Sequence, residues 1–246
     1  MRTISRISPG DFVFAISQST KNDLCNYSNI DPSRVYVTHL AAADNFRPCG
    51  DRARIDGVRR QYGIPDAPYA LSLCTLEPRK NIEATIRSFS RLVKQQNIDD
   101  LNLVLVGARG WKFDEIFNEL DRSLVEKERV FLTNYVPDED LSPLYSGSMM
   151  FVYPSLYEGF GLPPLEAMQC GVPVITSNTS SLPEVVGDAG IMVNPEDEDA
   201  ISQAMLELYQ SDELREDLSG RSLDRAAGFS WKKCADETVE AYIRAG

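Results

Sequence analysis

The sequence predicts an α/β fold built on a Rossmann-like, doubly wound parallel sheet. From about Tyr69 onward, short apolar runs alternate with helix-length amphipathic stretches, which is the pattern of repeated βα units around a parallel sheet. Most of the runs are continuously apolar, as strands covered on both faces require. The expected strands are 69–73, 103–106, 130–132, 149–153, 174–176 and 191–193.

Helices are expected between and after these strands. The clearest covers 81–95, where apolar residues recur at helical spacing after Pro78. A second covers 196–209 and carries acids in its first turn, where the helix dipole favours negative charge. Two further helices, 213–227 and 232–244, close the chain.

The first part of the chain has a different organisation. Residues 12–16 and 35–38 are expected to form strands, with a helix over 19–27 between them. One strand, one helix and one strand cannot bury both faces of a sheet. This segment is therefore expected to pack on the rest of the chain or on a partner.

Composition narrows the class of protein. The 246 residues are 43% hydrophobic and 25% charged, which is ordinary for a globular protein. A net charge of -12, with 37 acids against 25 bases, argues against a nucleic-acid partner. Five scattered cysteines without a C-x-x-C pair indicate neither a disulfide framework nor a zinc site. These features favour the cytoplasm.

No membrane-spanning or signal-peptide segment is expected. The first ten residues lack an apolar core, and no uncharged apolar run reaches membrane-spanning length. Peripheral contact with the inner face of the membrane stays open, although no strongly basic amphipathic segment stands out.

The most informative stretch is 153–176, which follows one strand and leads through a helix into the next. Glu158 lies in the loop at the carboxyl end of the strand, where doubly wound sheets bind ligands. Gly159 and Gly161 let backbone approach a ligand closely. Two prolines then open a helix whose amino end suits an anion. Glu166 on that helix is suited to accept hydrogen bonds from a diol such as ribose. By spacing alone, two solvated acids would give the same pattern.

This E-x7-E stretch resembles the signature of the retaining GT-B glycosyltransferases of family four. The order and spacing match closely, and the resemblance covers nearly the whole chain. Other segments look like the family's phosphate-binding loop, next strand, nucleotide-base loop with its helix, and two later blocks. They are 75–81, 103–107, 130–146, 180–190 and 229–231.

The resemblance implies roles for particular residues. Arg79 and Lys80 would hold the donor's diphosphate, Glu158 would face the donor sugar, and Glu166 would bind the nucleotide ribose. These first three residues are the candidate catalytic groups. The remaining candidate binding residues belong to the base loop or to the backbone that cradles sugar and phosphate. They are Asn134, Tyr135, Val136, Gly159, Phe160, Gly161 and Leu162.

The implied reaction is retaining transfer of a hexose from a nucleoside-diphosphate sugar to a glycan or lipid-linked acceptor. Negative charge builds on the leaving diphosphate, and two cations plus a helix amino end would stabilise it without a metal. No resident cofactor or metal is expected, so the nucleotide sugar is a substrate. Without the resemblance, Arg79 and Lys80 could also mark the start of a surface helix, but their place after an apolar strand favours an anion site.

The phosphate loop departs from the family in one respect. Many members carry an arginine near the positions of Cys74 and Thr75, whereas here Arg79 must serve alone. A branch that resembles O-antigen mannosyltransferases shares the G-T-L-E-P-R-K-N style, with Cys74 in place of its glycine. GDP-mannose is therefore the favoured donor.

The larger departure is that most of the amino-terminal acceptor domain of a GT-B enzyme has no counterpart. Residues 1–48 resemble its tail and the linker, 49–228 the nucleotide-sugar-binding domain, and 229–246 a helix that packs back toward the amino-terminal domain. A split enzyme with a separate acceptor-domain chain, a truncated chain or a degenerate gene would each look like this. A non-catalytic nucleotide-sugar-binding subunit is the alternative. Epimerases and phosphorylases share the two-domain fold but fit the motifs less well.

Other candidate residues are given structural roles. His39 is the only histidine, has no ligand cluster around it, and is interpreted as structural. The D-x-D runs at 138–140 and 197–199 are expected to cap helices rather than bind metal. Residues 107–110 lack the full G-x-G-x-x-G of a nicotinamide site. Trp111 and Trp231 are expected to be packing residues.

Overall fold

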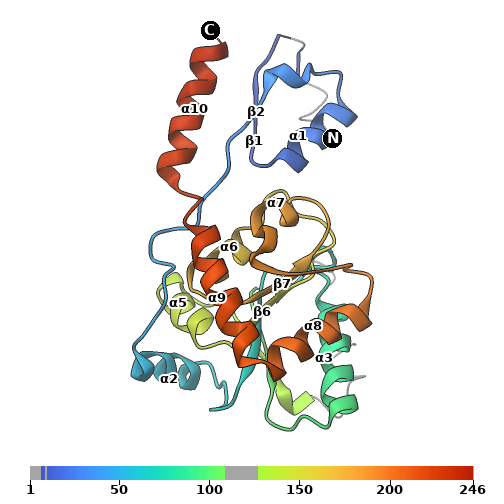
Figure 1. Cartoon of the computed structure of the whole chain (residues 1–246), viewed down its shortest axis with the longest axis vertical. Helices are drawn as coiled ribbons and strands as arrows, with labels where there is room; N and C mark the ends of the chain where they lie inside the picture. Colours follow the sequence, from blue (N-terminus) through green and yellow to red (C-terminus); the bar gives the residue numbers. More distant parts are fainter. Residues whose placement is uncertain (1–6, 9, 109–126, 246) are drawn as a thin grey trace.

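The computed structural model describes residues 7, 8, 10–108 and 127–245. Its largest element is a six-stranded sheet in which every neighbouring pair is parallel (Figure 1). The order of the strands is β5-β4-β3-β6-β7-β8. Their bounds are β3 (Tyr69–Leu73), β4 (Asn102–Val106), β5 (Val130–Asn134), β6 (Met150–Tyr153), β7 (Val174–Ser177) and β8 (Gly190–Val193).

Helices cover both faces of this sheet. They are α2 (Arg52–Gln61), α3 (Ile82–Gln96), α5 (Asp138–Ser146), α6 (Leu162–Gln169), α7 (Leu182–Val186), α8 (Glu198–Gln210) and α9 (Asp212–Ala226). The crossovers through α3 and α6 run in opposite directions along the sheet, so right-handed connections place these helices on opposite faces. Helix α8 packs on α3, and α9 packs on α6. Within the described part of the chain, no helix is long and apolar enough to cross a membrane.

The predicted fold class is confirmed, and so are the six predicted strands, whose ends shift by at most two residues. The reason is their burial: every residue of β4, β6 and β7 is buried. Helices α2 and α7 were not predicted. Helix α2 contains four arginines in ten residues, and Ile55 and Val58 are its buried apolar side chains. This stripe is too narrow for periodicity to reveal the helix.

The amino-terminal segment forms a separate small unit. Strands β1 (Val13–Ala15) and β2 (Val35–Val37) pair in parallel, and α1 (Gln18–Tyr27) connects them. The last helix, α10 (Trp231–Ala245), stands beside this unit rather than on the six-stranded sheet (Figure 1). The rings of Phe14 and Tyr242 lie 5.1 Å apart, centroid to centroid. The segment thus packs on the carboxyl-terminal helix and on loops of the larger domain.

Candidate active site

The candidate residues meet where the sheet reverses its strand order. From β3 the chain proceeds outward to β4, whereas from β6 it proceeds in the other direction to β7. Loops after two such strands diverge and leave a crevice at the carboxyl edge of the sheet. Arg79 and Lys80 follow β3, and Glu158 follows β6. The topology therefore brings Arg79 and Lys80 to Glu158, which lies 78 positions after Lys80 in the sequence.

The carboxylate of Glu158 is at the centre of this cluster. Lys80 Nζ (2.6 Å), Ser155 Oγ (2.7 Å) and Tyr153 OH (2.9 Å) all donate to its Oε1. Arg79 Nη1 donates to its Oε2 at 2.9 Å. Lys80 also donates to the Tyr153 hydroxyl at 2.6 Å. Because Glu77 pairs with Arg79 as well, at 2.7 Å, the cluster holds two cations and two carboxylates.

Glu158 is charged despite its burial. The residue is 7% exposed, and burial alone would raise its pKa. The hydrogen bond and positive charge of Lys80, with the hydroxyls of Ser155 and Tyr153, outweigh burial and hold the pKa below its ordinary value. Burial lowers the pKa of the Arg79 guanidinium, but the charge of Glu158 more than compensates and the pKa is raised. A pair of solvated acids is thus the wrong description of Glu158.

The backbone around the cluster is tied across the two loops. Asn81 takes a left-handed conformation (φ 59°) directly after the short 3-10 turn Pro78–Lys80. Its side-chain amide donates to the carbonyl oxygens of Pro154 (3.1 Å) and Pro195 (2.7 Å). The carbonyl of Arg79 accepts from the backbone of Leu156 at 2.9 Å. These bonds fix the position of the phosphate-loop candidates relative to Glu158.

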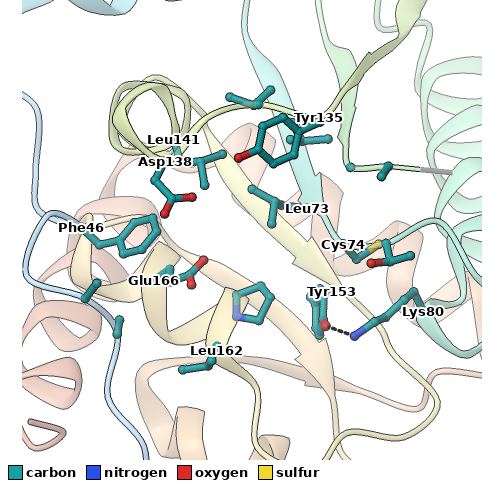
Figure 2. A pocket seen from close by; sticks show the side chains of 18 of the residues that line it. Phe46, Leu73, Cys74, Lys80, Tyr135, Asp138, Leu141, Tyr153, Leu162 and Glu166 are labelled. Carbon is teal, nitrogen blue, oxygen red and sulfur yellow. Dashed lines mark hydrogen bonds between the residues drawn. The ribbon is translucent and has the colours of Figure 1, made fainter. Parts of the chain in front are cut away.

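A pocket of about 660 Å³ runs from the cluster toward α5. Figure 2 shows Lys80 and Tyr153 at one end, Glu166 in the middle, and Asp138 and Phe46 toward the other end. Cationic side chains at one end, and the aromatic and aliphatic side chains beside Asp138 at the other, suit a ligand with a phosphate group and a flat ring.

Glu166 has an unusual titration. Its Oε2 accepts a 2.9 Å hydrogen bond from the hydroxyl of Tyr145. Burial raises its pKa to about 7; the charge of Asp138 adds to this, and the Tyr145 hydrogen bond opposes it. Near neutral pH the side chain therefore changes between a hydroxyl donor and a carboxylate acceptor in the middle of the pocket.

The structure brings part of the predicted binding set to this pocket. The candidates that line it are Arg79, Lys80, Tyr135, Val136, Leu162 and Glu166. Asn134, Glu158, Gly159, Phe160 and Gly161 do not line it. Asn134 is left-handed (φ 58°), and its carbonyl accepts from Gly107 N at 2.9 Å. Glu158 contacts two residues that line the pocket, Lys80 and Tyr153. The Gly159 carbonyl is directed to α1, and Gly161 is the N-cap of α6.

Sequence reasoning missed several residues of the site. Tyr153 is part of a buried strand, and its pattern revealed no polar role, yet its hydroxyl contacts both Lys80 and Glu158. Phe46 lines the pocket from the linker. Trp231, expected to pack, is 51% exposed and also lines the pocket. Its place at the start of an amphipathic helix in the sequence did not distinguish these two roles. Trp111 lies outside the described residues.

The two D-x-D runs differ from each other. Asp197 is the N-cap of α8, and its side chain accepts from Ala200 N at 3.0 Å, as expected. At α5, Pro137 occupies the N-cap position and no side chain caps the helix. Asp138 and Asp140 instead lie in its first turn, where the helix dipole still favours acids. Among the described residues there is no group of three His, Cys, Asp or Glu side chains placed to hold a metal ion.

A doubly wound sheet with a charged crevice at its switch point and a long pocket beside it defines the class of nucleotide-binding α/β domains. Residues 55–224 match the family described as "Glycosyl transferases group 1". Since this match covers more than half of the chain, the protein belongs to that family.

Two groups of curated relatives from Escherichia coli are similar over almost the whole chain. The O-antigen chain mannosyltransferase B is 41% identical over 230 residues, which are 94% of this chain and 60% of the relative. A serotype-specific mannosyltransferase WbdA is 34% identical over 245 residues, 99% of this chain and 30% of the relative. The chain thus spans 60% or less of the length of these two relatives.

Solved structures share the fold at lower identity. A glycosyltransferase from Rickettsia africae superposes with a TM-score of 0.85 at 19% identity, over 96% of this chain and 64% of that one. The Anabaena protein Alr3699/HepE, solved with UDP and glucose, gives 0.84 at 18% identity, over 94% and 62% of the two chains. Both support the assignment of this chain to a GT-B domain.

Proposed function

We propose that this chain is the donor-binding half of a retaining hexosyltransferase. It binds a nucleoside-diphosphate sugar and, with an acceptor-binding half, transfers the hexose to a glycan or a lipid-linked acceptor. The observation that carries the proposal is the contact of Lys80 and Arg79 with the buried carboxylate of Glu158 at the switch point of the sheet. The place of action is the cytoplasm, with at most peripheral contact at the inner face of the membrane.

The chemistry follows from the charges in the crevice. Transfer breaks the bond between the sugar's anomeric carbon and the diphosphate oxygen, and negative charge develops on that oxygen. Arg79 and Lys80 are already oriented by Glu158, so they stabilise this charge without reorganising. The leaving phosphate accepts the proton of the acceptor hydroxyl, and the Glu158 carboxylate binds hydroxyls of the donor sugar.

The pocket supports an ordered position for the nucleotide. The diphosphate lies at Lys80, the ribose diol meets Glu166, and the base reaches the Tyr135 and Val136 loop. GDP-mannose is the favoured donor, because both curated relatives reported above are named mannosyltransferases.

Calorimetric titration of the purified chain with GDP, UDP, ADP and GDP-mannose, with and without magnesium, tests the proposal. Binding of one nucleoside diphosphate without magnesium is expected. Glu166→Ala should lower that affinity, and more so for the ribonucleotide than for its 2′-deoxy analogue. Failure of every nucleotide to bind would refute the donor-binding role.

A non-catalytic nucleotide-sugar-binding subunit is the second candidate, because the roles proposed above for Arg79, Lys80 and Glu166 all serve binding of the donor. On that view the chain binds the donor but needs a separate acceptor-domain chain for turnover. Incubation of GDP-mannose with the chain and lipid-linked acceptors, with and without an added acceptor domain, separates the two. Turnover by the chain alone would exclude a purely binding role.

A further inference from the structure

Helix α1 begins directly against residues 158–161, which are here called the signature loop. Ser17 is the N-cap of α1, and its Oγ accepts from Thr20 N at 3.0 Å. The same hydroxyl donates to the carbonyl of Gly159 at 2.7 Å, and Thr20 Oγ1 donates to that carbonyl at 3.0 Å. Ser17 is fully buried. Two hydroxyls from one helix turn therefore fix the orientation of a single peptide group next to Glu158.

Glu184 on α7 binds the same end of α1. Gln18 N donates to both of its carboxylate oxygens at 2.8 Å, and Ser19 N donates to Oε2 at 3.3 Å. The first N–H groups of a helix lack partners within the helix, and a negative charge there is favoured by the dipole. His39 Nε2 lies 2.5 Å from Oε1 of Glu184. Since a carboxylate accepts only, this nitrogen carries the hydrogen.

The α7 region also holds the signature loop by its backbone. Glu158 N donates to Ser180 Oγ at 3.0 Å. Ser181 Oγ contacts the carbonyls of Glu158 (3.0 Å) and Phe160 (2.6 Å). Glu184 lies a few residues further along the chain. The segment that positions the loop is therefore the segment that binds α1.

Phe160 completes the contact. Its ring is buried and lies 6.1 Å from the ring of His39 and 5.9 Å from that of Phe229, centroid to centroid. His39 precedes the first connection between the amino-terminal unit and the six-stranded domain, and Phe229 precedes α10. Both connections are visible in Figure 1 between the two parts of the molecule. The signature loop and both connections between the two parts of the molecule thus contribute to one aromatic cluster.

The hydrogen-bonded carbonyl of Gly159 determines the direction of the next backbone N–H group, that of Phe160. In a trans peptide the C=O and N–H groups point in opposite directions. With the Gly159 carbonyl bound to α1, the N–H of Phe160 points away from α1, and it has no acceptor among the described residues. The bonds from α1 therefore fix the orientation of an unpaired N–H group beside Glu158.

We propose that Glu184 and Ser17 are positioning residues that join α1 to the signature loop, so that residues 158–161 keep their ligand-binding conformation only while the amino-terminal segment is docked. The effect of this coupling on ligand binding rests on the proposed donor-binding role. The coupling of the loop to helix α1 does not depend on that role.

Hydrogen–deuterium exchange of the 246-residue chain tests the coupling without a ligand. Glu184→Ala and Ser17→Ala should each speed exchange in peptides covering 157–162 by about tenfold. Glu184→Gln should be intermediate, because its amide oxygen still accepts one N–H. Ser19→Ala and Asp188→Asn are the matched controls, since neither side chain has a hydrogen bond among the described residues, and both should exchange like the parent chain.

Two results would overturn the proposal. One is parent-like exchange of 157–162 in Glu184→Ala and Ser17→Ala. The other is equal acceleration in peptides from β6 and β7, which would mean general destabilisation. A ligand measurement adds a second readout: Glu184→Ala should weaken GDP-mannose about tenfold but GMP by less than about twofold. If the parent chain binds no nucleotide, the donor-binding role fails while the exchange data still decide the coupling.

Discussion

Lys80 Nζ lies 2.6 Å from Glu158 Oε1, so the residue implied to hold the diphosphate contacts the residue implied to face the sugar. The Lys80 side chain is 11% exposed and that of Glu158 is 9% exposed. A pair so buried cannot lose one member without leaving the other charge poorly compensated. The position of Lys80 and the ionisation of Glu158 therefore depend on each other.

Lys80→Ala should reduce the affinity for GDP by about 10- to 100-fold, because a charge-assisted contact to the diphosphate is lost. Guanosine, which has no phosphate, should lose less than about threefold. Titration calorimetry with both ligands measures the difference. Arg60→Ala is the matched control, since Arg60 is exposed in the last turn of α2, outside the pocket. Equal loss of GDP and guanosine would contradict the diphosphate assignment.

Asn81 offers a test of how the phosphate loop is held. Asn81→Gly keeps the left-handed backbone accessible but loses two side-chain hydrogen bonds, at about 1–2 kcal/mol. Asn81→Ala should cost about 2–4 kcal/mol, because it adds the strain of a left-handed alanine. Urea unfolding gives both free energies. Identical losses would mean that the backbone conformation contributes nothing.

Gly107 lies where β4 passes the phosphate loop. A Cβ at this position would be 1.7 Å from the carbonyl oxygen of Cys74, and the backbone has φ +146°. Gly107→Ala should therefore lower the unfolding free energy by more than about 3 kcal/mol. Gly50→Ala, with nothing within 4 Å of the added Cβ, should change it by less than about 1 kcal/mol. Thermal unfolding measures both free energies, and equal losses for the two variants would disprove this steric argument.

The sheet could be predicted well from the sequence because strands that are buried on both faces consist of continuous apolar runs. It also placed Arg79, Lys80 and Glu158 at strand ends, where topology then brought them together. It could not predict which hydroxyls would complete the cluster. Tyr153 continues the apolar run of β6, and its position in that run does not reveal where its hydroxyl points.

Contacts between segments that are distant along the chain could not be predicted from the sequence for a related reason. Glu184 lies 166 positions from Gln18, and no periodicity connects an acid on a five-residue helix with the amino end of another helix. Trp231 starts an amphipathic helix, so its pattern suited packing equally well. Its exposure at the pocket depends on where α10 leaves the larger domain.

Glu166 makes stability depend on pH in a direction opposite to that of a salt-bridged acid. Its pKa is raised from 4.5 to about 7 by burial, so between these values the folded chain binds more protons than the unfolded chain. Stability is therefore lost as pH rises through this window and is constant above it. Glu166→Gln removes the effect, so the variant should gain on the parent by on the order of 2 kcal/mol between pH 5 and pH 8. Urea unfolding at several pH values measures this gain.

Tyr145→Phe, which removes the hydrogen bond that lowers the pKa of Glu166, should extend this pH window upward. A pH-independent difference between Glu166→Gln and the parent would mean that Glu166 is already ionised at pH 5 in the folded chain.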